Sequence, residues 1–245
     1  MPFDPGARRD CGVSFLGTPC DSCPVRSLTI CAPLSDTELH QIAEITQTQS
    51  FGSHEAVFNE DEEATALYNI TGGAVKLYKL LEDGRRQIMG FMFTGDFLGL
   101  TPGDRYSYTA ETVTSTTVCR FPRTGIENLM EHSQSLQKRL FAVAMTDLKA
   151  AQEQMLLLGR KTAKEKIASF LLHLSDRARQ RGQPDNPLFV PMGRVDIADF
   201  LGLTTETVSR TVTQLKNAGL IRLKDNSRIM LADQDGLRAI AGSHH

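Results

Sequence analysis

The sequence predicts an α+β protein in which an N-terminal β-roll, or jelly roll, is joined by a long helix to a C-terminal winged helix-turn-helix. Three observations predict this fold class: short apolar segments divided by turn residues, a long amphipathic stretch after them, and two short helical patterns around a glycine near the C-terminus. The predicted divisions are a cysteine-rich segment, the roll, the long helix and the winged helix-turn-helix, at residues 1–34, 35–133, 134–160 and 161–245.

The composition fits a protein with a good core. The chain has 245 residues, of which 40% are hydrophobic, and this length predicts two domains. Its formal charge is -2, but the basic residues are unevenly placed: 14 Lys and Arg oppose 9 Asp and Glu from Gly159 onward, and 13 oppose 20 before it. The basic surplus therefore lies with the predicted helix-turn-helix, as neutralisation of DNA phosphates requires. We expect a cytoplasmic protein with no membrane partner, because the sequence has neither an apolar signal region nor 18 consecutive apolar residues.

Three cysteines are closely spaced near the N-terminus. They are Cys20, Cys23 and Cys31, with Cys11 before them and Cys119 far downstream. In a reducing compartment structural disulfides are not expected, and this Gly/Pro/Ser-rich segment lacks the periodicity of a core element. A Cys-x2-Cys pair suits two thiolates on one centre, either tetrahedral zinc or an iron–sulfur cluster, and spacing does not separate the two. Taken singly, Cys11 fits an unrelated thiol and Cys119 a small buried hydrophobe.

The roll is predicted from a short helix followed by strands. Ser35 and Glu38 form a capping box that begins the helix. The expected strands are residues 56–58, 66–70, 74–78, 87–93 and 112–121, with turns at 71–73, 82–84 and 94–96. Strands at this spacing are typical of a sandwich or barrel.

The long helix carries an apolar stripe with alternating three- and four-residue spacing. This heptad pattern is typical of a coiled-coil dimer, although a helix packed on its own domain can show the same stripe. Because helix-turn-helix proteins commonly bind two half-sites as symmetric dimers, we expect a dimerisation helix and a homodimer. The predicted seam consists of Phe141, Ala144, Leu148, Ala151, Met155 and Leu158.

A second capping box, Thr162 and Glu165, begins the next helix, and residues 195–221 then predict the helix-turn-helix. Its first helix should bury Val195, Ala198 and Leu201, Gly202 should permit the turn, and Thr204 should cap the second helix. That helix should bury Val208, Val212 and Leu215. Two strand-like segments, 220–223 and 228–231, flank a turn at 225–227 and predict the wing.

The outward face of the second helix begins with residue types that bind base edges in the major groove. Arg binds guanine with two hydrogen bonds, Glu accepts from the cytosine amino group, and Ser bonds to several bases. Such helices contact bases with their N-terminal residues. The sequence therefore predicts that double-stranded DNA is contacted by Thr205, Glu206, Ser209 and Arg210.

The order of these parts resembles the cyclic-AMP receptor superfamily and, within it, the fumarate-and-nitrate-reduction (FNR) regulators of bacteria. The specific motifs are Cys20-x2-Cys23, Cys31, the distant Cys119 and Gly202-Leu-Thr-Thr-Glu-Thr-Val-Ser-Arg210. The resemblance implies a cyclic-nucleotide-binding-like roll and an oxygen-labile [4Fe-4S] cluster. By this resemblance, the ligands are Cys20, Cys23, Cys31 and Cys119, and Cys11 is spare.

The resemblance also implies partners and a mode of action. In that family the intact form is a dimer that binds a TTGAT-N4-ATCAA type palindrome and recruits RNA polymerase, mainly as an activator. The exposed, charged hairpin around residues 82–87 resembles a polymerase-contacting loop. Cluster assembly is expected to stabilise the dimer through the seam, and Asp147 and Glu153 beside it could repel across the two-fold axis.

One part departs from the superfamily pattern. Cyclic-nucleotide binders carry a glutamate after the Gly-Asp-Phe-x-Gly stretch and an Arg-Ser-Ala type phosphate clip. Here Leu100 follows Gly99, and the clip region begins Arg105-Tyr-Ser-Tyr108. We therefore expect no cyclic nucleotide.

Two alternatives stay open at this point. One is a regulator of the same fold whose cysteines bind zinc or sense oxidants as thiols. The other is a thiol oxidoreductase that uses Cys20 and Cys23. That enzyme would need a βαβ context for its Cys-x2-Cys motif, and neither that context nor a convergent catalytic set occurs in the sequence, so we expect no enzyme.

Overall fold

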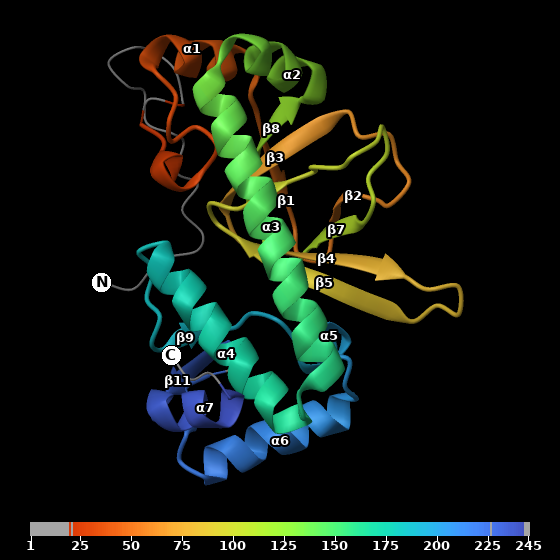
Figure 1. Ribbon diagram of the computed structural model, residues 1–245, viewed down its shortest axis with the longest axis vertical. Coiled ribbons are helices and arrows are strands. Elements are labelled where there is room, and N and C mark those ends of the chain that lie inside the picture. The colour runs from red at the N-terminus through yellow and green to blue at the C-terminus, as the bar shows by residue number, and fades with distance from the viewer. Residues whose placement is uncertain (1–19, 21, 226, 243–245) are drawn as a thin grey trace.

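The computed structural model describes residues 20, 22–225 and 227–242. A roll of strands lies beside a long helix, α3, and a smaller domain of helices and short strands lies below the roll at the other end of α3 (Figure 1). This arrangement agrees with the predicted fold class.

The roll consists of two antiparallel four-stranded sheets, with strand orders β1-β8-β3-β6 and β2-β7-β4-β5. Apolar side chains from both sheets, such as Ile70, Val75 and Val118, fill the space between them. The strands are β1 (Gln47–Phe51), β2 (Ala56–Phe58), β3 (Ala66–Gly72), β4 (Ala74–Leu80), β5 (Arg86–Phe93), β6 (Phe97–Leu98), β7 (Thr109–Thr112) and β8 (Thr116–Pro122).

Two differences from the predicted strands have local causes. The single strand expected over 112–121 is two strands, β7 and β8, which belong to different sheets. Strand β1 was not predicted, because its sequence is largely polar and three of its five residues are exposed, although all five pair with β8. The turn between β3 and β4 contains Gly73 at φ 97°, where a Cβ would collide with Thr116.

Four helical segments accompany the roll: η1 (Arg26–Leu28), α1 (Asp36–Ile45), α2 (Arg123–His132) and α3 (Gln134–Arg160). The predicted capping box of α1 is confirmed, with the Ser35 N–H donating to Glu38 Oε2 at 2.8 Å and the Glu38 N–H donating to Ser35 Oγ at 3.4 Å. At the start of α3, Leu136 and Leu140 are buried beneath α1 and α2. These contacts fix the direction in which α3 leaves the roll.

The C-terminal domain consists of four helices and a three-stranded sheet with order β10-β11-β9. The expected wing hairpin is confirmed, since Ile221 pairs with Leu231 and Leu223 with Ile229. The elements are α4 (Ala163–Gln180), β9 (Leu188–Phe189), α5 (Arg194–Leu201), α6 (Thr205–Asn217), β10 (Ile221–Leu223), β11 (Arg228–Leu231) and α7 (Gln234–Ala241). In the described part of the chain, no helix has both the length and the apolar character needed to cross a bilayer.

Candidate DNA interface and cysteine site

The helix-turn-helix is formed by α5, a turn at Gly202 and α6. Gly202 adopts the left-handed conformation, φ 61° and ψ 47°, which a residue without a Cβ enters at little cost. The Thr204 hydroxyl then accepts from the Thr207 N–H at 3.2 Å and caps α6, as predicted. The inward face is also as predicted, with Val208, Val212 and Leu215 at most 4% exposed.

The prediction that Val195 is a core residue of α5 is wrong. Val195 is 55% exposed, whereas Ile197, Ala198 and Leu201 are buried. The reason is helical geometry: residues 194, 197, 198 and 201 share one face of α5, and Val195 lies about 100° away from the centre of that face.

The four predicted base-contacting residues lie at the N-terminal half of α6. Glu206, Ser209 and Arg210 are exposed, and Thr205 is half-buried. Hydrogen bonds from its own backbone N–H and from the Thr204 hydroxyl hold the pKa of Glu206 below its usual value. The Glu206 carboxylate is therefore ionised at neutral pH and available as an acceptor.

Basic side chains that the sequence analysis did not single out surround this face. Lys216 lies in the last turn of α6, and Arg222, Lys224 and Arg228 lie on the wing hairpin, all exposed. In the sequence, the excess of Lys and Arg from Gly159 onward indicated that such a basic surface exists. Exposed cations beside a recognition helix can contact phosphates, which position a protein on the duplex without reading its sequence.

The second candidate site is a small cavity between the N-terminal segment and the roll. Four of its lining residues are Cys20, Cys23, Cys31 and Cys119. The first three come from the turns around η1, and Cys119 comes from β8. The fold therefore brings the distant Cys119 next to the three closely spaced N-terminal thiols, whereas Cys11 lies outside the described residues.

The cavity wall contains polar side chains that the sequence analysis missed, among them the buried Asn69. Asn69 on β3 is 2% exposed, and its amide nitrogen donates to Cys31 Sγ at 3.9 Å. Its Oδ1 is buried without a hydrogen-bond partner among the described residues. In the sequence, Asn69 could have been found as the lone amide within the apolar strand 66–70. Buried amides rarely remain unsatisfied, so such a residue indicates a polar partner nearby.

Burial dominates the electrostatics of this cavity. It raises the pKa of the Cys31 thiol to about 11, so this thiol is neutral at pH 7 in the absence of a metal. The Cys31 N–H donates to Thr29 Oγ1 at 3.3 Å, which orders the segment next to the thiol. A metal centre would have to displace the proton, as thiolate ligation always requires.

The four cysteines of the cavity are suitable ligands for an iron–sulfur cluster, but the cavity is too small to contain one. Four cysteines around one apolar cavity are the usual ligands of such clusters. The cavity volume is about 20 Å³, roughly the space of a water molecule, and no three His, Cys, Asp or Glu side chains of the described residues are arranged to hold a single metal ion. A cluster would therefore require the segment around η1 to move outward from β8.

The predicted dimer seam lies on the side of α3 that its own chain leaves uncovered. Phe141 is 69% exposed and Met155 is 64% exposed, and Ala144, Leu148 and Ala151 are exposed as well. Leu158 is half-buried. Exposed apolar residues that the sequence analysis did not include, Met145 and Leu156, extend this face.

Of the two acidic residues beside the seam, Glu153 has ion-pair partners within the chain. Desolvation by neighbouring groups and the Asp96 carboxylate raise the pKa of Asp147 to about 6, although this residue is exposed on α3. Glu153 lies 3.8 Å from Lys149 Nζ and 4.0 Å from His173 Nδ1. Repulsion of Asp147 and Glu153 across a two-fold axis stays a prediction.

The part of the roll that corresponds to a nucleotide clip is packed with aromatic rings. Tyr106 is 3% exposed and stacks on Phe58 with ring centroids 3.8 Å apart. The Tyr106 hydroxyl donates to the Ala66 carbonyl at 2.8 Å, and the Arg105 guanidinium donates to the Asp61 carbonyl. Arg105 is therefore engaged with the roll's own backbone.

The hairpin expected to be an exposed polymerase contact divides into two parts. Its tip, residues 81–85, is exposed. Arg86 and Gln87 are half-buried, because they bond to α5: Arg86 Nε donates to Asp199 Oδ2 at 2.9 Å and Gln87 Nε2 donates to the Asp199 carbonyl at 2.8 Å. The expectation was thus wrong for these two residues, whose side chains face the helix-turn-helix.

Comparison with known proteins agrees with this architecture. A family model described as a Crp-like helix-turn-helix domain matches residues 165–240, and a model described as a cyclic nucleotide-binding domain matches residues 48–133. Two relatives are the transcriptional activatory protein AadR of Rhodopseudomonas palustris, 46% identical over 81% of this chain and 83% of that protein, and the fumarate and nitrate reduction regulatory protein of Salmonella typhi, 31% identical over 91% and 90%.

A solved structure is similar along its whole length. The structure of FixK2 from Bradyrhizobium japonicum matches with a TM-score of 0.77 and 36% identity, covering 82% of this chain and 100% of that chain. The winged helix-turn-helix, the roll and the long helix define a DNA-binding transcription regulator. The chain belongs to the CRP/FNR family of transcription regulators.

Proposed function

We propose that this protein is a homodimeric, oxygen-responsive transcription activator that binds a TTGAT-N4-ATCAA type palindrome and contacts RNA polymerase. The observation that carries the sensing part is the cavity lined by Cys20, Cys23, Cys31 and Cys119. A [4Fe-4S] cluster held by these cysteines would supply the oxygen-sensitive chemistry. The names of the relatives, an activatory protein and a fumarate and nitrate reduction regulator, support activation and a link to respiration.

The DNA contacts follow from α6. Its exposed Glu206, Ser209 and Arg210 are assigned to base edges, and Thr205 to the first contact at the helix start. The cations on the wing and at the end of α6 are assigned to phosphates, where they supply affinity and salt dependence. Proteins of this architecture read a palindrome because two copies of the recognition helix are related by a two-fold axis.

The dimer is assigned to the exposed face of α3. An uncovered stripe with heptad spacing on a helix of 27 residues is typical of a two-stranded coiled coil. Its residues are Phe141, Ala144, Leu148, Ala151, Met155 and Leu158. Because Leu136 and Leu140 anchor the start of α3 close to Cys31, a change in the cysteine segment can alter how the two α3 helices meet.

Asn69 and Arg139 connect the cavity with its surroundings. Arg139 on α3 donates to the carbonyls of Leu28 and Thr29, at 2.9 and 3.2 Å, and so ties the helix to the cysteine segment. Asn69 holds a hydrogen-bond donor at Cys31 Sγ, where it would favour a thiolate over a thiol.

The exposed tip of the β4–β5 hairpin, residues 81–85, is assigned to RNA polymerase.

Anaerobic purification tests this function directly. The experiment records the visible spectrum, the iron and sulfide content and the affinity for the palindrome, and then repeats them after admission of oxygen. We expect brown protein with about four irons per chain, as four-cysteine ligation implies, and a joint loss of colour and DNA affinity in air.

Matched cysteine variants sharpen the test. Cys119→Ala should lose the colour and the oxygen response, whereas Cys11→Ala should keep both. Zinc-containing or metal-free protein with oxygen-independent DNA binding would retain the regulator and remove the cluster. Thiol-dependent DNA binding without a metal would support the thiol sensor, and dithiol turnover would support the oxidoreductase.

A further inference from the structure

The roll and the C-terminal domain meet in one shared apolar cluster. The ring of Phe91 on β5 packs against Phe170 of α4 and Phe200 of α5, with centroids 6.2 and 5.2 Å away, and Ile88 and Phe93 belong to the same cluster. Apolar contact is not directional. By itself this cluster would hold the two domains together without fixing their relative angle.

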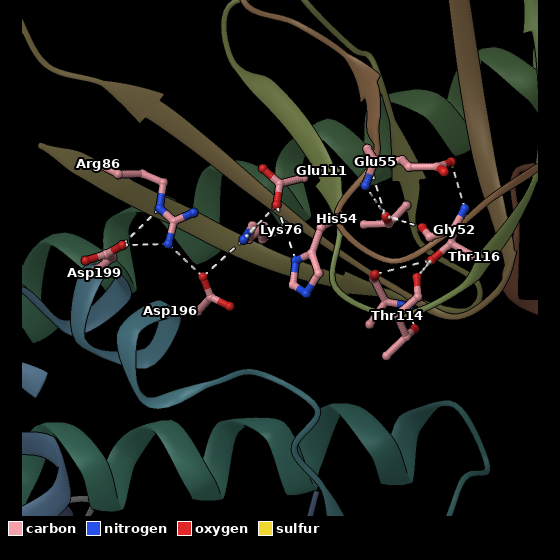
Figure 2. A network of polar contacts seen from close by, with 12 residues as sticks. Gly52, His54, Glu55, Lys76, Arg86, Glu111, Thr114, Thr116, Asp196 and Asp199 are labelled. Atoms are coloured by element: carbon pink, nitrogen blue, oxygen red, sulfur yellow. Dashed lines mark hydrogen bonds and ion pairs between the residues drawn. The ribbon is translucent and has the colours of Figure 1, made fainter. Parts of the chain in front are cut away.

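In a first group of ion pairs, cations of the roll bind carboxylates of α5 (Figure 2). Asp196 Oδ1 lies 3.1 Å from Lys76 Nζ and 2.8 Å from Arg86 Nη2. Lys76 also lies 2.9 Å from Glu111, and Arg86 also binds Asp199. Lys76 and Asp196 are only 3% and 8% exposed, so the pair that they form is shielded from solvent and salt, whereas Arg86 and Asp199 are half-buried.

In a second group of ion pairs between the two domains the polarity is reversed. Here the roll supplies the carboxylate, Asp96, and α4 supplies the cations. Arg177 Nη2 lies 2.7 Å from Asp96 Oδ2, and Arg181 Nη2 bonds to both Asp96 oxygens at 2.9 and 2.8 Å. Both guanidinium groups also lie over the Phe93 ring.

Two ion clusters of opposite polarity define one orientation. A shift or rotation of the C-terminal domain would separate the ion pairs of both clusters at once. Charges that are buried or partly buried would then lack their partners, which is strongly unfavourable. Intact buried pairs add little net stability compared with apolar contacts, and their best-attested use is to specify register. The charge pattern therefore indicates a function in orientation.

We propose that the Lys76–Asp196–Arg86 cluster and the Asp96–Arg177–Arg181 cluster fix the angle of α6 relative to the dimer helix α3, and so set the half-site spacing that the dimer accepts. Because one base pair adds about 3.4 Å along the duplex and rotates the next half-site, a fixed angle selects one spacer length. Lys76, Arg86, Asp196, Asp96, Arg177 and Arg181 are positioning residues, since they need not touch DNA. This inference rests on the proposed palindrome.

The test compares Asp196→Asn with Asp235→Asn. Both substitutions remove one negative charge from the same domain, but Asp235 lies on α7, where it pairs with Arg238, and its side chain is 94% exposed. Affinity is measured for the anaerobic full-length protein on palindromes with the N4 spacer and with spacers one base pair shorter and longer. Wild type and Asp235→Asn should share one spacer preference, and Asp196→Asn should reduce that preference by about tenfold, within the usual energy of site discrimination.

A second readout is independent of DNA. Amide hydrogen exchange of α5 and β5 should rise in Asp196→Asn and stay unchanged in Asp235→Asn, because only the first variant loosens the domain contact. If Asp196→Asn does not fold, it is replaced by Arg86→Gln, a substitution at a half-buried residue of the same cluster. An unchanged spacer preference with unchanged exchange would overturn the inference, whereas failure of wild type to bind the palindrome at all would overturn the proposed function instead.

Discussion

Replacement of Phe141 by alanine tests the dimer seam. Phe141 is 69% exposed, so packing against the described residues of its own chain does not explain its presence on α3. A phenylalanine side chain buries about 150–250 Å² when fully covered, so a partner helix would remove roughly 100–170 Å² of each copy from water. At about 25 cal/mol per Å² this area corresponds to about 2.5–4 kcal/mol per side chain, as an upper value.

Association also orders side chains and desolvates polar groups, so we assign about half of that energy to dimer stability. The two copies in a dimer then contribute about 2.5–4 kcal/mol, and Phe141→Ala should raise the dimer dissociation constant by roughly a hundredfold or more. The stability of the monomeric chain should change by less than about 0.5 kcal/mol, because the side chain is exposed there.

Sedimentation velocity under anaerobic conditions, over a range of protein concentrations, measures this constant. The matched control is Phe189→Ala, since Phe189 on β9 is also an exposed aromatic residue, at 45%, but lies outside α3. An unchanged dimer constant for Phe141→Ala, or an equal loss in the Phe189 variant, would refute the assignment of the seam.

Three further predictions concern single side chains. Arg210→Ala should weaken specific DNA binding by about 1–3 kcal/mol and relax the preference at one guanine, and equal losses on specific and random DNA in a binding titration would count against base contact. Hydrogen bonds from Ser133 and Ser35 lower the pKa of Glu38 from 4.5 to about 2, so its stabilising effect is complete above pH 4.5 and is lost as the pH falls toward 2. The urea midpoint of Glu38→Gln should therefore lie below that of wild type at pH 7 and approach it at acid pH, while a constant difference would contradict the assignment. Asn69→Leu should stabilise the metal-free protein by about 1 kcal/mol in urea unfolding, because it removes a buried carbonyl oxygen that has no partner among the described residues; destabilisation of that size would indicate that this oxygen is satisfied.

Local sequence patterns were sufficient for most elements. The capping residues Ser35, Thr162 and Thr204 and the turn at Gly202 act through neighbouring backbone groups, so their effect can be read within one helical turn. The same holds for the buried face of α6, which follows from helical periodicity. Val195 shows the limit of this approach, because three apolar residues at three-residue spacing drift around a helix and can include one that faces solvent.

The sequence by itself therefore determined the element order, the caps, the recognition helix and the candidate thiols, all of which depend on short-range patterns and spacing. Only the tertiary structure decided which distant groups meet: Cys119 with the N-terminal cysteines, Asn69 with Cys31, and Asp196 with Lys76 and Arg86. Charged and polar residues such as these carry no periodic signal of their partners. Their positions follow from the way two sheets and a helical domain pack together, and that packing is fixed by contacts between residues far apart in the chain.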